Sequence, residues 1–276
     1  MKDINYRTYL VTLLILMSGF AIFVFGSPYY SFFLTNNNQS YYFLLTIIFL
    51  ILSLILKRQK KFLRFWPIAY SFFIASAATL FLNIGLLNIH VPISDKVQFI
   101  AIDKLSQFLH IVPIIIILSL LGKYDLRSIF LTRGDLKEGF SFGVISFTAF
   151  TLIALLIFRQ SPDFFNRLLT SSPWLLLFVF ANSIMEELWF RAIFLNKFTD
   201  VIGPTTSILV TSIVFGTSHI NATYSFPGGP IVFGLVVFSL GLIGANSMRK
   251  TGSIIGPVLF HAGYDLLIIL PILASI

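Results

Sequence analysis

Residues 41–56 read YYFLLTIIFLILSLIL and are followed directly by the basic run KRQKK at residues 57–61. An apolar run of about 20 residues is long enough to cross the hydrocarbon core of a membrane as a helix, and this run approaches that length. The basic residues that follow are typical of a cytoplasmic loop, because Lys and Arg are concentrated there in membrane proteins. The stretch therefore predicts a membrane-spanning helix that ends in the cytoplasm.

The composition shows that this run is one of many. Hydrophobic residues make up 57% of the 276 positions and charged residues only 11%, whereas an average soluble domain has about 25% charged residues. So little polar surface excludes a soluble enzyme, a disordered chain and a coiled coil. Because the apolar runs are continuous and do not alternate with polar residues, a β-barrel is excluded as well. The sequence predicts an all-α protein, a polytopic transmembrane helical bundle of about eight or nine spans.

Nine stretches are candidates for these spans. His110 and Pro113 interrupt the fourth stretch, and we expect residues 98–105, which precede it, to lie flat at the membrane interface. No connection is long enough to fold as a soluble domain of its own. The nine stretches are residues 8–26, 41–56, 66–86, 106–122, 140–158, 173–197, 204–222, 230–248 and 253–275.

The distribution of basic residues predicts the orientation. If the N-terminus is cytoplasmic, 15 of the 19 Lys and Arg residues fall on the cytoplasmic side, and the other four are Lys96, Lys104, Arg159 and Arg167. This bias predicts a multi-pass protein of the cell membrane with a cytoplasmic N-terminus and, for nine spans, an outer C-terminus. It also accounts for the net charge of +8 without a nucleic-acid partner. The chain has no cysteine, so a zinc–thiolate site is excluded, and nothing indicates an oligomeric state.

A few charged residues lie within the predicted spans, where ionisable groups are costly and usually functional. The sixth stretch contains ANSIMEELWFRAIF at residues 181–194. Glu187 and Arg191 are four residues apart, so they share a helix face and can form an ion pair. Glu186 is rotated by about 100° from Glu187 and points elsewhere. We expect Asn182, one turn earlier, to hold Glu186 by a hydrogen bond and Glu186 to act as a general base or acid.

Two further spans carry histidines at a similar depth. His219 lies in the seventh stretch, and His261 and Asp265, again four residues apart, share a face of the ninth. At 1.5 Å per residue, Glu186 and His219 lie roughly 18 and 22 Å above the turn near residues 198–203, and His261 roughly 12 Å above the start of its span. Helix tilt absorbs such differences. We therefore expect one mid-membrane site that contains these four residues.

Each residue alone also has a structural interpretation. His219 is then a hydrogen-bond partner between helices, Glu187 and Arg191 are a neutralised pair, and Asp265 is a packing group or a proton-relay acid. His110, in the interrupted fourth stretch, is interpreted as structural. The combination of two acids, two histidines and an arginine at compatible depth favours a chemical role for the set.

The order of these residues resembles a known family. Glu186 to Arg191 fits the pattern EExxxR, Phe215 to His219 fits FxxxH, and His261 to Asp265 resembles HxxxN. Together they resemble the CPBP family (CAAX protease and bacteriocin-processing, or Abi) of intramembrane endopeptidases, which includes the type II CAAX prenyl proteases. The resemblance covers residues 173–275. It divides the chain into accessory transmembrane helices at 1–172 and a catalytic helical core at 173–276.

The resemblance implies hydrolysis of a peptide bond in a peptide or protein substrate within or beside the lipid bilayer. Glu186 and His219 would activate a water molecule, and His261 with residue 265 would stabilise the oxyanion. Asn182, Glu187, Arg191 and Phe215 are expected to support them. In a metal-dependent version, His219 and His261 bind a divalent metal such as zinc, and Glu186 remains the base. In a metal-free version, Glu186 takes the proton directly.

The chain departs from the family pattern at two positions. Ala192 replaces a frequent glycine, which is a minor change, and Asp265 replaces the more frequent asparagine. An amide donates a hydrogen bond to an oxyanion, whereas an ionised carboxylate only accepts. Three roles are therefore open for Asp265: a protonated donor, an acceptor that orients His261, or a metal ligand.

Two other functions compete with the peptidase. The first is a non-catalytic membrane partner with the same fold, such as an immunity protein or a regulator of a sensor kinase. The second is a proton-coupled transporter that uses Glu186 and the histidines as a relay. The complete Glu/His/His set favours the peptidase over the first. The absence of an obvious pair of broken helices in matching halves of the sequence argues against the second.

Overall fold

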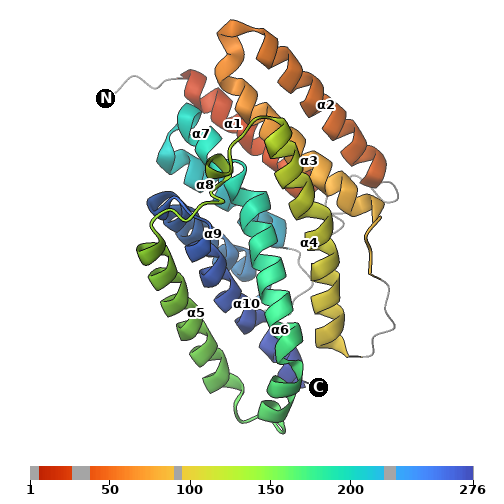
Figure 1. Ribbon diagram of the computed structural model, residues 1–276, viewed down its shortest axis with the longest axis vertical. Coiled ribbons are helices and arrows are strands. Elements are labelled where there is room, and N and C mark those ends of the chain that lie inside the picture. The colour runs from red at the N-terminus through yellow and green to blue at the C-terminus, as the bar shows by residue number, and fades with distance from the viewer. Residues whose placement is uncertain (1–5, 27–37, 90–94, 221–227, 276) are drawn as a thin grey trace.

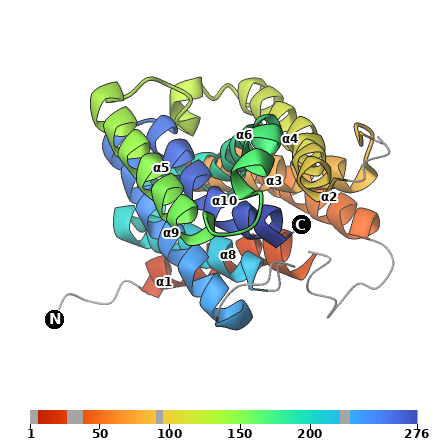
Figure 2. The ribbon, with the colours of Figure 1, turned by 90° about the horizontal axis from the view of Figure 1, so that it is seen from below.

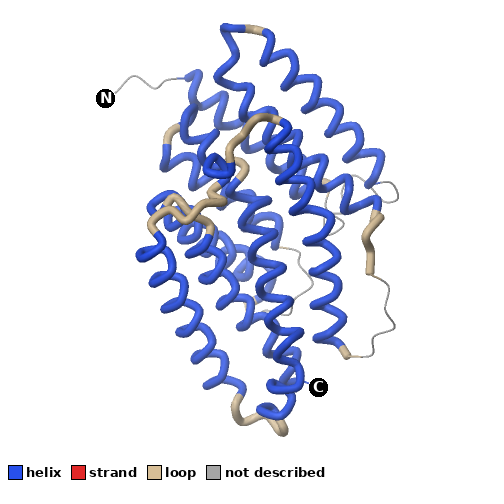
Figure 3. The backbone as a smooth tube through the Cα atoms, viewed as in Figure 1, coloured by secondary structure: helices blue, strands red, loops and turns tan. Residues whose placement is uncertain are grey.

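The computed structural model describes residues 6–26, 38–89, 95–220 and 228–275 (Figure 1). Every regular element within these ranges is a helix, as predicted (Figure 3). Eight of the described helices, some of them with the helical turns that adjoin them, are long and apolar enough to cross a membrane. These are α1 (Tyr6–Phe20), α2 (Asn38–Arg58), α3 (Trp66–Ile84), α4 (Lys96–Leu121), α5 (Leu136–Phe158), α6 (Phe164–Glu186), α9 (Gly229–Thr251) and α10 (Ile255–Ser275).

The seventh predicted span, 204–222, begins as expected, and its last two residues, 221 and 222, lie outside the described part of the chain. It forms α8 (Pro204–His219), which has 16 residues. At 1.5 Å per residue α8 is about 24 Å long and falls short of a hydrocarbon core of about 30 Å. It nevertheless runs antiparallel to α9, because Gly216 packs against Gly234 and Phe238 while Gly241 packs against Ser212. These glycines allow the two backbones to approach closely.

The expectation that residues 98–105 lie flat at the interface is wrong. The helix α4 is continuous from Lys96 to Leu121 and passes through Pro113. Its early start has a local cause, since the Asp95 side chain caps the helix by accepting a hydrogen bond from the Gln98 backbone N–H at 2.8 Å. The first two turns of α4 therefore belong to the bundle.

The helix α10 occupies the centre of the bundle. It packs against α4, α5, α6 and α9, and it is the most buried of the eight candidate spans. In contrast, α2 lies at the edge of the bundle against α3, as Figures 1 and 2 show. The residues that α10 contributes are consequently placed among several neighbouring helices at once.

Loops that carry many basic residues meet at one end of the bundle. Backbone hydrogen bonds join Asp135 to Thr251 and Ile254 to Phe130. In the same region, Lys197 of α7 (Leu195–Ile202) donates to the Ser128 carbonyl at 2.5 Å. The helix α1 begins toward this end, and α10 ends toward the other (Figure 1). This grouping agrees with the arrangement that the charge distribution predicts.

We expect this end of the bundle to face the cytoplasm. In a chain without cysteine, a single cysteine introduced as Gln59→Cys should react with a membrane-impermeant maleimide only after the cells are opened. Gln160→Cys, in the exposed turn between α5 and α6, should react in intact cells. The opposite labelling pattern would reverse the orientation.

Candidate active site

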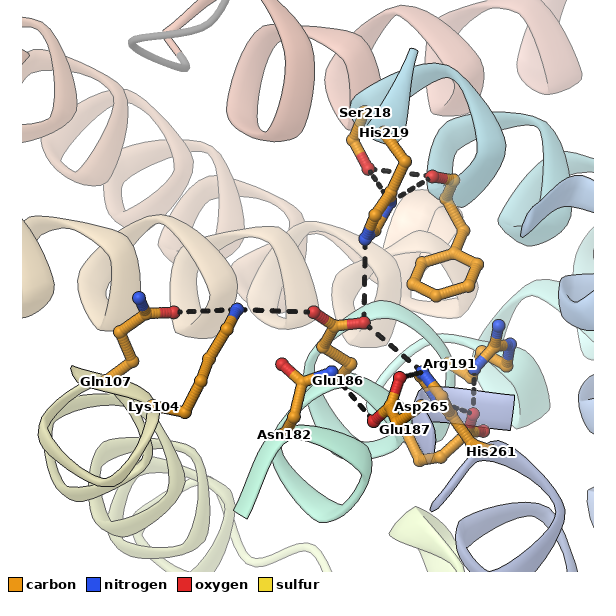
Figure 4. Close-up of polar contacts among 11 residues, drawn as sticks. Lys104, Gln107, Asn182, Glu186, Glu187, Arg191, Ser218, His219, His261 and Asp265 are labelled. Carbon is orange, nitrogen blue, oxygen red and sulfur yellow. Dashed lines mark hydrogen bonds and ion pairs between the residues drawn. The ribbon is translucent and has the colours of Figure 1, made fainter. Parts of the chain in front are cut away.

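Four helices bring polar side chains to a single buried site (Figure 4). It includes Glu186 at the end of α6, His219 at the end of α8, and His261 and Asp265 on α10. The sequence reasoning grouped these four residues at one depth, and they lie together. Figure 4 also shows a residue that the sequence reasoning placed elsewhere, Lys104 of α4. All five line a cavity of about 360 Å³.

The backbone changes its helical geometry within the first motif. The α-helix α6 ends at Glu186, and residues Glu187–Ala192 form a π-helical turn. The Ile193 N–H reaches back five residues to the Leu188 carbonyl at 3.3 Å. Turns of this kind are rare and often occur at functional sites. Glu186 and Glu187 are thus the last α-helical and the first π-helical residue, and their carboxylates have different partners.

Glu186 faces both histidines with the same oxygen. Its Oε2 lies 3.6 Å from His219 Nε2 and 3.6 Å from His261 Nε2. Its other oxygen, Oε1, lies 3.9 Å from Lys104 Nζ. One carboxylate oxygen is therefore shared by two imidazoles, while the other is turned toward a cation.

The opposite nitrogen of each histidine is bound to a neighbouring group. His219 Nδ1 lies 2.8 Å from the Phe215 carbonyl oxygen, and His261 Nδ1 lies 2.9 Å from Glu187 Oε1. A carbonyl oxygen and an ion-paired carboxylate only accept hydrogen bonds, so each Nδ1 carries the proton and donates it. Both rings are consequently oriented so that Nε2 points at Glu186.

The predicted pair of Glu187 and Arg191 is present, and both residues are completely buried. The Arg191 guanidinium also lies over the Phe215 ring, 4.1 Å from its centroid. Gly244 of α9 packs against this pair, since a Cβ there would lie 3.5 Å from Glu187 Oε2. Glu187 thus connects Arg191 to His261 and holds the imidazole in place.

The Phe215 ring packs against Arg191 and against both histidines of the site. Its ring contacts His219 edge-on at a centroid distance of 4.6 Å and His261 at 5.8 Å. Because the ring also supports Arg191, it fills the space between the first motif on α6 and the histidines on α8 and α10. This arrangement gives the aromatic residue of the second motif a physical role.

Asn182 binds a different residue from the one expected. Its Nδ2 donates to Asp265 Oδ2 at 3.1 Å rather than to Glu186. Asp265 Oδ1 lies 3.6 Å from His261 Nε2, which is longer than a hydrogen bond. The group that orients His261 is therefore Glu187, and Asp265 is held by the amide of Asn182.

With this geometry in view, one comparison with known proteins gives a match. Residues 168–267 match the family described as type II CAAX prenyl endopeptidase Rce1-like. Over that segment, which is about a third of the chain, the protein is similar to this family. Neither the comparison with curated proteins nor the comparison with solved structures found a match. The matched segment contains all three motifs, whereas Lys104 lies outside it.

Sequence reasoning missed the approach of Lys104 to Glu186. It assigned Lys104 to the outer side because α4 was expected to begin near residue 106. The cap at Asp95 was the available signal, since it starts the helix early enough to carry Lys104 into the bundle. His110 is structural, as expected: its Nε2 accepts from the Leu87 N–H at 2.8 Å, and its Nδ1 lies 2.7 Å from the Ser106 carbonyl.

The metal-dependent version was tested against the arrangement of possible ligands. His219, His261 and Glu186 offer donor types that zinc accepts. Within the part of the chain that the structure describes, however, no three or more His, Asp or Glu side chains are grouped so that they could hold a metal ion. We therefore derive no catalytic step through a metal.

We expect Glu187→Gln to destabilise the protein strongly. The substitution leaves Arg191 as an uncompensated buried charge, which costs about 3–5 kcal/mol. Thermal unfolding of the purified protein in detergent should show a large loss of stability. Glu138→Gln is a matched control because its pair with Lys250 is partly exposed, and such pairs contribute about 0–1 kcal/mol. Equal effects of the two substitutions would contradict the proposed role of Glu187.

We expect Asp265→Asn to retain or increase peptide cleavage. The asparagine can still accept from Asn182, its amide can donate where a protonated Asp265 would, and His261 remains oriented by Glu187. Cleavage rates of the variant and the parent protein measure the effect. A fall of about 10²–10³ in rate, with the fold intact, would show that the carboxylate charge itself is needed.

Proposed function

We propose that this protein is an intramembrane endopeptidase that hydrolyses a peptide bond of a membrane-associated peptide or protein. The observation that carries the proposal is the position of Glu186 Oε2, which is 3.6 Å from the Nε2 atom of both His219 and His261. The match of residues 168–267 to the type II CAAX prenyl endopeptidase family supports the same general activity. The site offers a buried base with two oriented imidazoles beside a cavity.

The distances from Glu186 Oε2 to the two histidine Nε2 atoms suit a bridging water molecule as the reactant. A separation of 3.6 Å is too long for a direct hydrogen bond, and a water about 2.8 Å from each atom spans it. In the proposed reaction, this water attacks the peptide carbonyl carbon while its proton passes to Glu186. The carbon–nitrogen bond then breaks as Glu186 returns the proton to the leaving amine. The products are a carboxylic acid and an amine, and Glu186 is regenerated.

The oxyanion of the tetrahedral intermediate needs hydrogen-bond donors. We assign this role to a protonated Asp265 and to His261 in its imidazolium form, in which Nε2–H donates to the oxyanion while Nδ1–H stays bound to Glu187. Both residues face Glu186 from α10. His261 is held by Glu187 at 2.9 Å, and Asp265 is held by Asn182 at 3.1 Å. Both groups are thus preorganised before substrate arrives, and His219 completes the contact with the water from α8.

The cavity supports a partly apolar substrate. Its walls include Phe178, Val237, Leu240 and Ile268 beside the polar site residues. Such a lining suits an extended peptide with apolar side chains near the cleaved bond. A peptide or protein segment in the lipid bilayer satisfies this requirement, and we propose a multi-pass location in the cell membrane with a cytoplasmic N-terminus.

The decisive experiment uses the purified protein in lipid nanodiscs with candidate membrane-associated peptides. Glu186→Gln should reduce cleavage by at least about 10²-fold because it removes a general base without changing the shape of the side chain. The melting temperature should stay close to that of the parent protein, in contrast to Glu187→Gln. Mass spectrometry of the products locates the cleaved bond.

Two outcomes would change the proposal. Full cleavage by the Glu186→Gln variant would remove Glu186 from the chemistry. Binding of a peptide or protein without Glu186-dependent cleavage would favour a non-catalytic membrane partner. Treatment with EDTA separates the two mechanisms: the metal-free version predicts unchanged cleavage, whereas loss of activity that added zinc restores would support a metal bound by His219 and His261.

A further inference from the structure

The cation nearest to the proposed base comes from the half of the chain outside the family match. Lys104 Nζ lies 3.9 Å from Glu186 Oε1. Its side chain is only 16% exposed and lines the same cavity as Glu186 and the two histidines. A lysine within a membrane-length helix is costly unless it has a partner or a function. Lys104 therefore needs an explanation that the three motifs do not provide.

A polar chain along α4 supports the Lys104 ammonium. Lys104 Nζ donates to Gln107 Oε1 at 3.3 Å, and Gln107 Nε2 donates to Asp103 Oδ2 at 2.8 Å. Figure 4 shows Gln107, Lys104 and Glu186 in line, with the ammonium between the amide and the carboxylate. The side chain is thus directed at Glu186 by its own helix.

Arg191, the buried arginine of the site, already has other partners. Arg191 pairs with Glu187 and packs on Phe215, so it is held on the side of the site where Glu187 lies. Among the ion pairs of the described residues, Lys104 is the lysine or arginine that faces Glu186, whose other partners are His219 and His261. In a low-dielectric interior, such a pairing is far stronger than at a surface.

The two carboxylate oxygens of Glu186 consequently have different partners. Oε1 is turned toward Lys104, and Oε2 is turned toward the Nε2 atoms of His219 and His261. We propose that Lys104 is a positioning residue for catalysis, which fixes Glu186 so that Oε2 faces the reacting water. This inference rests on the proposed peptidase function. It makes α4 part of the catalytic site, so that residues 1–172 are more than accessory helices.

The test measures kcat and KM for a peptide whose cleavage depends on Glu186. Lys104→Met should lower kcat by about 10²-fold, the size of effect expected when a reacting group is misplaced by about 1 Å. KM should change little because the cavity walls remain. Lys104→Arg keeps the charge and should retain most of the activity. Lys96→Met, at an exposed position on the same helix, should behave like the parent protein.

The cysteine-free chain allows the charge to be restored chemically. Lys104→Cys should lose activity, and alkylation with 2-bromoethylamine should restore it because the product carries an ammonium at nearly the original position. Reaction with neutral methyl methanethiosulfonate should not restore it. This comparison separates a need for the charge from a need for side-chain volume.

The possible failures are distinguishable. If Lys104→Met keeps the parent kcat while Glu186→Gln abolishes cleavage, the role of Lys104 is wrong and the peptidase function stands. Equal rescue by the neutral reagent would also overturn the role of the charge. If cleavage does not depend on Glu186 at all, the proposed function fails, and the role of Lys104 fails with it. An altered melting temperature of Lys104→Met that Lys104→Arg shares would assign Lys104 to folding instead.

Discussion

The cost of placing charge at membrane depth governs the structure of this site. Glu187 and Arg191 compensate each other's charge by forming an ion pair inside the bundle, where neither side chain is accessible to solvent. Its consequences extend beyond two charges, because Glu187 also accepts the Nδ1–H of His261. The pair therefore ties α6 to α10 and determines which nitrogen of His261 faces the cavity. The ion pair thus orients a histidine of the candidate site.

Adjacent acidic residues acquire different functions through the helix that carries them. Glu186 and Glu187 are neighbours in sequence, yet the change from α-helix to π-helix falls between them. Glu187 turns into the packed interior toward Arg191, and Glu186 turns toward the cavity. The family match covers residues 168–267, but the surroundings of Glu186 include Lys104 of α4, which lies outside that segment. The contacts of the motif residues therefore include a helix that the motif does not contain.

The exchange of asparagine for Asp265 is accommodated by local contacts. Asn182 donates to one oxygen of Asp265, and the other oxygen faces His261 Nε2 at 3.6 Å. A protonated Asp265 adds no charge to the site, so the buried negative charges are those of Glu186 and Glu187, and each benefits from a nearby cation. The ammonium of Lys104 lies beside Glu186, so the departure from the family pattern and the contribution of α4 are compatible.

The sequence by itself determined the fold class and grouped four of the residues that line the cavity, namely Glu186, His219, His261 and Asp265. Long apolar runs leave only helices as membrane-crossing structures, because backbone polar groups must be satisfied within the lipid. The spacing of four residues between Glu187 and Arg191 determined their pairing, since it places both on one helix face. Motif order and depth then brought Glu186, His219 and His261 together. These conclusions depend on local periodicity and on charge, which a sequence displays directly.

Only the tertiary structure decided the partners of the individual atoms. Three contacts join helices that are distant in the chain. Asn182 binds Asp265, Glu187 binds His261, and Lys104 lies beside Glu186. The early start of α4 was likewise missed, because hydropathy does not report where a helix is capped. Helix periodicity gives the face on which a side chain lies. The packing of neighbouring helices determines what that side chain meets.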